Sequence, residues 1–432
     1  MEKKNGNFLA IAIMFFLFMM ISFVTGLQNP FGVIVKQQFS ATNLMSQLGN
    51  AANFIAYAFM GLPAGLILSK KGYKFTALSA VAVGLVGVTI TFLSGMVGSF
   101  GVYLLGAFVS GFSMCMLNTV VNPMLNTLGG GGNKGNQLIQ WGGSCNSLAA
   151  TICPVFVGYL IGEVSQDTKI ADANPALFIA MGIFALAFII ILLSDIPEPE
   201  LAAAAASADA PKEGTMATIK GALSYKHFVF GIIAIFLYVG VEVGIPGTLN
   251  FYLSDSVNGA GMDPSTAVAI AGFVAGTYWL LMLVGRLTSS VISGKVSART
   301  QLTCVSAVAL VLIVLAIILG NSSTVSMPVF KGGADGFGMV QVPIAALLLV
   351  LCGLCTSVMW GTIFDLACEG LGASTNQASG IFMAMVVGGG IVPLIQNAIA
   401  DAIGYMPSYW LLVACVGFIL YFAAVGSKVK KA

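Results

Sequence analysis

Twelve apolar stretches, each long enough to cross a lipid bilayer, occupy most of the chain. A helix needs about 20 apolar residues to cross a hydrocarbon core of about 30 Å, and only closed hydrogen-bonded structures cross it without unpaired backbone groups. The sequence therefore predicts an all-α integral membrane protein with twelve transmembrane helices. These stretches are approximately 8–34, 43–69, 75–95, 98–126, 136–162, 175–194, 227–253, 265–293, 300–319, 341–365, 376–403 and 406–426.

The scarcity of charged residues leaves no water-soluble alternative. Only 8% of the 432 residues are charged, whereas an ordinary soluble domain has about 25%. Hydrophobic residues make up 58% of the chain, which is more than one core encloses. The composition excludes a soluble enzyme, a disordered chain and a disulfide-stapled secreted domain. The net charge of +2 gives no basic surface for nucleic acid, so we expect no nucleic-acid partner.

One hydrophilic segment divides the spans into two sets of six. It runs over 195–226 and holds proline, small residues and both charge signs, but no apolar run. We therefore expect two pseudo-symmetric six-helix bundles, 1–194 and 227–432, joined by a cytoplasmic linker over 195–226. Such a layout is typical of transporters whose halves arose by duplication.

Basic residues support both the duplication and a membrane orientation. Lys70 and Lys74, between the second and third spans, recur with the same spacing as Lys295 and Arg299 between the eighth and ninth. With a cytoplasmic N-terminus, cytoplasmic segments hold fourteen of the 18 Lys and Arg residues, as the positive-inside rule requires. We expect a multi-pass protein of the bacterial inner (plasma) membrane with both termini in the cytoplasm, acting as a monomer.

Two ionisable residues lie well inside the predicted spans, Glu242 in the seventh and Arg286 in the eighth. Because an ionisable group at membrane depth costs at least about 2.5 kcal/mol, such residues are candidates for function. We interpret Glu242 either as a carboxylate that carries a coupling proton or as the permanent partner of Arg286 in a pair that joins two helices.

Amide side chains are more numerous in the spans and accompany prolines that interrupt helices. Asn and Gln offer both hydrogen-bond donors and acceptors, and tryptophan rings cover the C–H face of a sugar. The alternative is that the amides only join helices, at about 0.6 kcal/mol each. Their clustering favours a binding site for an uncharged polyol. The predicted substrate-binding residues are Gln28, Asn29, Asn118, Asn122, Gln140, Asn146, Asn250, Trp279 and Trp360.

Four passages resemble transporters of the major facilitator superfamily, and more narrowly the L-fucose permease-like branch of fucose/glucose–galactose/H+ symporters. The resemblance covers nearly the whole chain and implies uptake of a neutral monosaccharide by alternating access. The passages are GLPAGLILSKKGYK (61–74), MLNTVVNPMLNTLG (116–129), FLYVGVEVGIPGTLNFY (236–252) and GIFMAMVVGGGIVPLIQNAIADAIG (380–404).

The chain departs from this branch where proton-coupled members carry carboxylates, one in the first span and one in the fourth. The matching positions are Asn29 and Asn118, and neither amide can release a proton. Amide hydrogen bonding to sugar remains compatible with the resemblance, whereas Glu242 is the remaining candidate for a proton carrier.

We therefore expect a secondary active transporter of a neutral monosaccharide, meaning a hexose, deoxyhexose or amino sugar, coupled to H+ through Glu242 and Arg286 or to Na+. A passive sugar uniporter and a multidrug or metabolite exporter are alternatives with the same architecture. The sequence shows no nucleotide-binding loop, metal-ligand cluster or nucleophile–base set, so we expect no cofactor, metal site or enzymatic activity.

Overall fold

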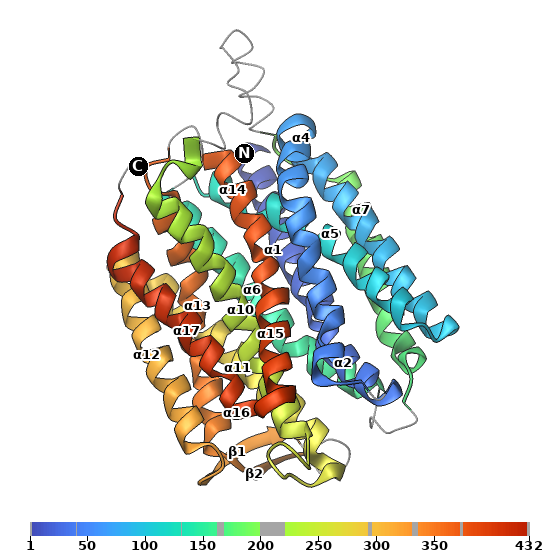
Figure 1. Cartoon of the computed structure of the whole chain (residues 1–432). Helices are drawn as coiled ribbons and strands as arrows, with labels where there is room; N and C mark the ends of the chain where they lie inside the picture. The colour runs from blue at the N-terminus through green and yellow to red at the C-terminus, as the bar shows by residue number, and fades with distance from the viewer. Residues whose placement is uncertain are drawn as a thin grey trace.

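Long apolar helices make up most of the computed structural model, and both chain ends lie at the same end of the bundle (Figure 1). The structure describes residues 2–39, 41–130, 132–161, 168–198, 221–292, 296–330, 336–371 and 375–429. Within these ranges, ten helices are long and apolar enough to cross a membrane. One of the ten, α4, covers the second and third predicted spans. The fifth predicted span corresponds to α6, which is not one of the ten.

The first half of the chain contains α1 (Glu2–Gly26), α2 (Gln28–Gln38), α3 (Asn43–Ser46), α4 (Leu48–Val97), α5 (Phe100–Leu128), α6 (Gly132–Ile161), η1 (Ile170–Ala173) and α7 (Asn174–Leu193). Helix α4 bends at Gly72, whose φ of 83° and ψ of 179° are not helical. Only glycine adopts that φ without steric cost. The bend therefore marks the turn between the second and third predicted spans. The first predicted span is divided at Leu27, between α1 and α2.

The second half contains α10 (Lys226–Ser254), α11 (Pro264–Ile292), α12 (Ala298–Leu319), α13 (Ile344–Cys368), α14 (Thr375–Ala384), η4 (Met385–Val387), α15 (Gly388–Ile403), α16 (Tyr405–Ser408), α17 (Trp410–Tyr421) and η5 (Phe422–Gly426). The predicted linker falls largely on 199–220, outside the described residues. The division into bundles at 194 and 227 therefore stays a prediction.

An antiparallel hairpin, β1 (Thr324–Phe330) and β2 (Phe337–Pro343), lies at the end of the bundle opposite the termini (Figure 1). The sequence predicted a helix from residue 341. The structure instead pairs Gln341 and Val342 with β1 and starts α13 after Pro343. The tenth span therefore begins later than hydropathy indicated, because apolar residues are equally compatible with a strand and a helix over so short a length.

Lys74 and Arg299, which occupy matching places between predicted spans of the two halves, make similar contacts at helix ends. The Lys74 ammonium donates to the carbonyl of Ser194 just after α7, at 2.8 Å. The Arg299 guanidinium donates to the carbonyl of Ser427 just after η5, at 3.3 Å. Cations at these positions satisfy carbonyls that lack helical partners at helix ends.

The chain after α7 returns to the bend of α4 through Glu198. Its two carboxylate oxygens accept hydrogen bonds from the backbone amides of Tyr73, at 2.6 Å, and Lys74, at 2.8 Å. These amides follow the bend at Gly72 and have no acceptor within the helix that they begin. The carboxylate therefore caps that helix, an arrangement worth about 0.5–2 kcal/mol.

The halves meet along α4 with α14 and α15, and along α6 with α11. Glycines permit the first contact. A Cβ added to Gly61 would lie 2.8 Å from the backbone nitrogen of Ala384, and one added to Gly390 would lie 2.9 Å from the carbonyl oxygen of Ala51. Helices approach this closely in membranes only where small residues face each other.

Charged residues join the halves at the end of the bundle opposite the termini. The backbone amide of Leu44 donates to the Asp401 carboxylate at 3.0 Å, and the Lys36 ammonium lies 5.3 Å from the centre of the Phe251 ring. Burial lowers the pKa of Lys36, while the nearby charges of Asp255 and Asp401 oppose that shift. Lys36 of the first half therefore lies close to two carboxylates of the second.

Candidate functional site

A cavity lies between the two halves and is lined by residues of both. Its empty volume, which includes its opening to solvent, is about 1190 Å³. Helices α1, α4, α5 and α6 contribute from the first half, and α10, α11, α13 and η4 contribute from the second. A ligand in this cavity would contact both halves at once.

Most of the residues predicted for the site line this cavity. They come from five different helices, and the structure brings them together from positions far apart in the sequence. The lining includes Asn118, Asn122, Gln140, Asn146, Glu242, Trp279, Arg286 and Trp360. The side chains of Gln28 and Asn29, which begin α2, lie outside the described part of the chain.

Asn250 does not line the cavity, contrary to the prediction. It follows Glu242 by two helical turns on α10, and its Oδ1 is buried without a hydrogen-bond partner among the described residues. The spacing placed both side chains near one face of the helix, but it also separates them by about 12 Å along the axis. Asn250 therefore lies on the same face of α10 as Glu242 but at a different position along the helix axis.

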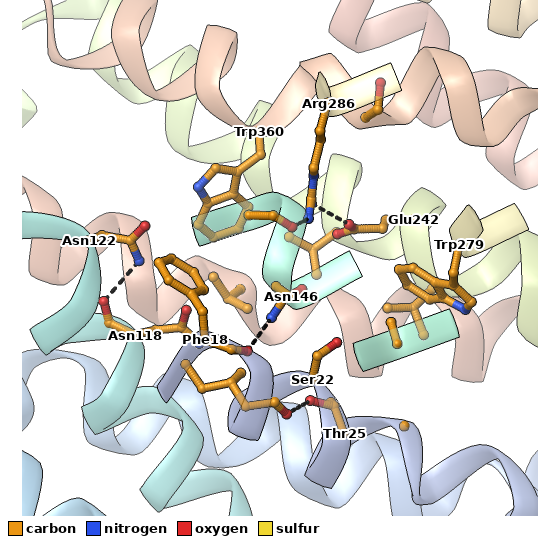
Figure 2. Close-up of a pocket in the computed structure, with 18 of the residues that line it drawn as sticks. Phe18, Ser22, Thr25, Asn118, Asn122, Asn146, Glu242, Trp279, Arg286 and Trp360 are labelled. Carbon is orange, nitrogen blue, oxygen red and sulfur yellow. Dashed lines mark hydrogen bonds and ion pairs between the residues drawn. The ribbon is translucent and has the colours of Figure 1, made fainter. Parts of the chain in front are cut away.

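The three asparagines predicted for the site that line the cavity are hydrogen-bonded within the first half (Figure 2). The Asn146 amide donates to the carbonyl of Phe18 at 3.1 Å. The Asn122 amide donates to the carbonyl of Asn118 at 2.9 Å. The Asn118 amide itself donates to the hydroxyl of Tyr57 at 3.0 Å and to the carbonyl of Met114 at 3.1 Å. These bonds hold the amide groups in defined orientations.

Arg286 connects the two halves at the edge of the cavity. Its Nη2 lies 3.5 Å from Oε1 of Glu242 on the neighbouring helix α10 (Figure 2). Its Nη1 donates across the interface to the carbonyl of Gly143 and to the hydroxyl of Ser147, both on α6 and both at 2.7 Å. The guanidinium therefore contacts the carboxylate of its own half and, at the same time, a backbone carbonyl and a side-chain hydroxyl of the other half.

Several lining residues were not predicted from the sequence. Asn50 is the clearest case, because an amide within an apolar span is a signal that could have been used. Its side chain donates to the carbonyl of Gly389 across the interface at 3.2 Å. The aromatic residues gave no such signal, since they resemble lipid-facing ones. The unpredicted lining residues include Phe18, Ser22, Thr25, Asn50, Phe54, Tyr57 and Ser357.

Comparison with known proteins gives a consistent result over the length of the chain. The family model of the Major Facilitator Superfamily matches residues 14–393. A putative glucose/galactose transporter of Helicobacter pylori is 30% identical over 442 residues, which cover 99% of this chain and 98% of that protein. A glucose/galactose transporter of Brucella abortus is 30% identical over 434 residues, which cover 99% and 96%.

More distant similarity extends to a third sugar transporter and to its structure. The L-fucose-proton symporter of Escherichia coli is 23% identical over 451 residues, which cover 99% of this chain and 96% of that protein. A crystal structure of the E. coli fucose:proton symporter matches with a TM-score of 0.72 at 18% identity and covers 98% of this chain and 99% of that chain. This structural match shows a shared fold.

Proposed function

The chain belongs to the Major Facilitator Superfamily, and from that premise we propose that it takes up a neutral monosaccharide by alternating access. Membership of this family of transporters confirms the predicted superfamily and the predicted all-α, multi-pass membrane fold, and it shows a transporter rather than an enzyme. The identity of the substrate, the coupling ion and the roles of the site residues are proposals.

One observation carries the sugar assignment: amides and tryptophans share a cavity between the two halves. Asn118, Asn122 and Asn146 line the first-half wall, while Trp279 and Trp360 line the second-half wall. A sugar offers hydroxyl groups to amides and C–H faces to aromatic rings, so this pair of walls suits a monosaccharide. Relatives named as glucose/galactose transporters, aligned over 99% of this chain, support the same substrate class.

Uptake of radiolabelled sugars into proteoliposomes tests this function. We expect at least one sugar among D-glucose, D-galactose, L-fucose and their amino derivatives to accumulate when an inward pH gradient is imposed. Accumulation driven by a sodium gradient would select Na+ coupling, and equilibration without accumulation would select a passive uniporter. Transport of hydrophobic cations with no sugar uptake would contradict the proposal and favour an exporter.

For coupling, we propose that Glu242 takes up the proton and that Arg286 transmits the change to the interface. Deprotonated Glu242 shares the Arg286 guanidinium with acceptors on α6. Protonation neutralises the carboxylate that lies 3.5 Å from Arg286, which weakens the attraction between Arg286 and Glu242. The hydrogen bonds from Arg286 to α6 are unchanged. A proton at Glu242 thus alters the balance of contacts between the halves without any direct contact with α6.

We also propose that both termini lie in the cytoplasm of a bacterial cell, with the protein a monomer in the inner membrane. The distribution of Lys and Arg supports the orientation, and both termini lie at one end of the bundle (Figure 1). A C-terminal fluorescent protein that matures only in the cytoplasm is expected to fluoresce. A dark fusion at normal expression would contradict this orientation.

A further inference from the structure

The asparagines of the cavity each turn their NH₂ group toward the protein. Asn146, Asn122 and Asn118 donate to the backbone carbonyls of Phe18, Asn118 and Met114, respectively, and Asn50 donates to Gly389. A carbonyl oxygen can only accept a hydrogen bond. The side-chain nitrogen must therefore face it, which fixes which end of each amide is the oxygen.

The Oδ1 atoms of these four asparagines remain available to a ligand. No hydrogen bond reaches them from the described residues, and they are not among the unpartnered polar atoms that are sealed inside the protein. All four side chains line the cavity. Each therefore presents an oxygen that can accept two hydrogen bonds.

Two hydroxyl side chains of the lining follow the same rule. The hydroxyl of Thr25 donates to the carbonyl of Ile21, and the hydroxyl of Ser357 donates to the carbonyl of Leu354 at 2.6 Å. Each hydroxyl has only one hydrogen, which these bonds use, so what remains toward the cavity is lone pairs. Acceptors thus come from α1, α4, α5, α6 and α13.

We infer that this site recognises its ligand through hydroxyl groups that act as hydrogen-bond donors to an array of acceptor oxygens. The inference rests on the proposed sugar transport and adds a direction to every polar contact on the asparagine wall. Ligand groups that can only accept, such as carboxylates and phosphates, would meet acceptor oxygens at these asparagines and would find donors only at other lining residues, such as Tyr57, Trp279 and Arg286. Neutral polyhydroxy compounds are the class that fits.

Deoxy and deoxyfluoro sugars separate donation from acceptance. A deoxy position can neither donate nor accept, whereas a fluorine at the same position keeps some capacity to accept but cannot donate. Each parent sugar that is transported is compared with both analogues at every ring position, by competition in counterflow with purified protein in proteoliposomes. At positions that the asparagines contact, we expect both analogues to compete at least about tenfold more weakly than the parent, consistent with the loss of one buried hydrogen bond.

Retention of parent affinity by the fluoro analogue at every position where the deoxy analogue fails would overturn the inference. The hydroxyl groups would then be accepting from protein donors, while sugar transport itself would stand. Failure of every parent sugar to compete is a different result, because it overturns the proposed function together with the inference.

Single substitutions assign the effect to the asparagine wall. Asn146→Leu, Asn118→Leu and Asn122→Leu should each lower the affinity for the parent sugar to that for its fluoro analogue at one ring position. The ratio of the two affinities at that position then falls to about one. Gln137→Leu is the matched control, because Gln137 is exposed on α6 and does not line the cavity. An unchanged ratio in all three asparagine variants would contradict the inference.

Discussion

Glu242→Gln is expected to reduce sugar accumulation driven by a pH gradient to the level of simple equilibration, while counterflow exchange stays within about twofold of the wild type. Glutamine matches glutamate in size and can still accept from Arg286, which lies 3.5 Å away. It cannot bind and release a proton, so only the coupled mode of transport is lost. Both modes are measured in the same proteoliposome preparation with radiolabelled sugar.

Glu369→Gln provides the control for the loss of an acidic group from the second half. The side chain of Glu369 is exposed beyond the end of α13, and the contact with His227 is made by its backbone carbonyl. This variant should accumulate sugar like the wild type. Undiminished accumulation by Glu242→Gln would exclude Glu242 as the proton carrier, and stimulation by sodium alone would point to the other ion.

Gly61→Leu is expected to abolish both accumulation and counterflow, a loss of at least about tenfold in each. A Cβ at Gly61 would lie 2.8 Å from the backbone nitrogen and 2.9 Å from the Cα of Ala384. Because these are backbone atoms and not the end of a flexible side chain, α4 and α14 would have to separate. The contact between the halves could then no longer form, and alternating access needs it to form in every cycle.

Gly65→Leu is the matched control, one turn further along the same helix. Nothing lies within 4 Å of a Cβ added to Gly65, so this variant should transport normally. Gly61→Ala adds the smallest side chain and should show an intermediate loss. A monodisperse, wild-type-like profile on size exclusion establishes that each variant is folded. Normal counterflow by folded Gly61→Leu would contradict the requirement for close contact.

The helices themselves were largely predictable from hydropathy. The seventh span, predicted at 227–253, is α10 (Lys226–Ser254), and the eighth, predicted at 265–293, is α11 (Pro264–Ile292). Deviations occur where local backbone geometry decides the outcome, at the break after Gly26 and at the β1–β2 hairpin. An apolar run indicates which residues are shielded from water, but it does not indicate where the backbone bends.

The role of the three consecutive glycines was not predictable in the same way. Gly388, Gly389 and Gly390 lie within the eleventh predicted span, where three glycines in a row are as compatible with a flexible point as with close packing. In the structure they form the start of α15 and are buried against neighbouring helices. A Cβ at Gly388 would collide with the carbonyl of Phe236, and one at Gly389 would lie 2.8 Å from the Phe54 ring. Their absent side chains therefore serve close packing.

The chemistry of the candidate site was visible in the sequence because amides, tryptophans and an ion pair are rare within apolar spans. Their arrangement was not. Asn250 shares a helix face with Glu242 but does not line the cavity, whereas Asn50, which was not among the predicted residues, lines it. Helical spacing gives direction around one axis, but it gives neither depth in the cavity nor the neighbouring helix.

The sequence by itself determined that this chain spans a membrane many times, that few charges lie within the spans, and which residue types were available for binding. Those properties depend on the composition of each segment alone. Only the tertiary structure decided that Arg286 bridges the halves, which asparagines share one cavity, and that their oxygens face it. These features depend on how helices are rotated and shifted against one another, which is set by packing at small residues across the interface.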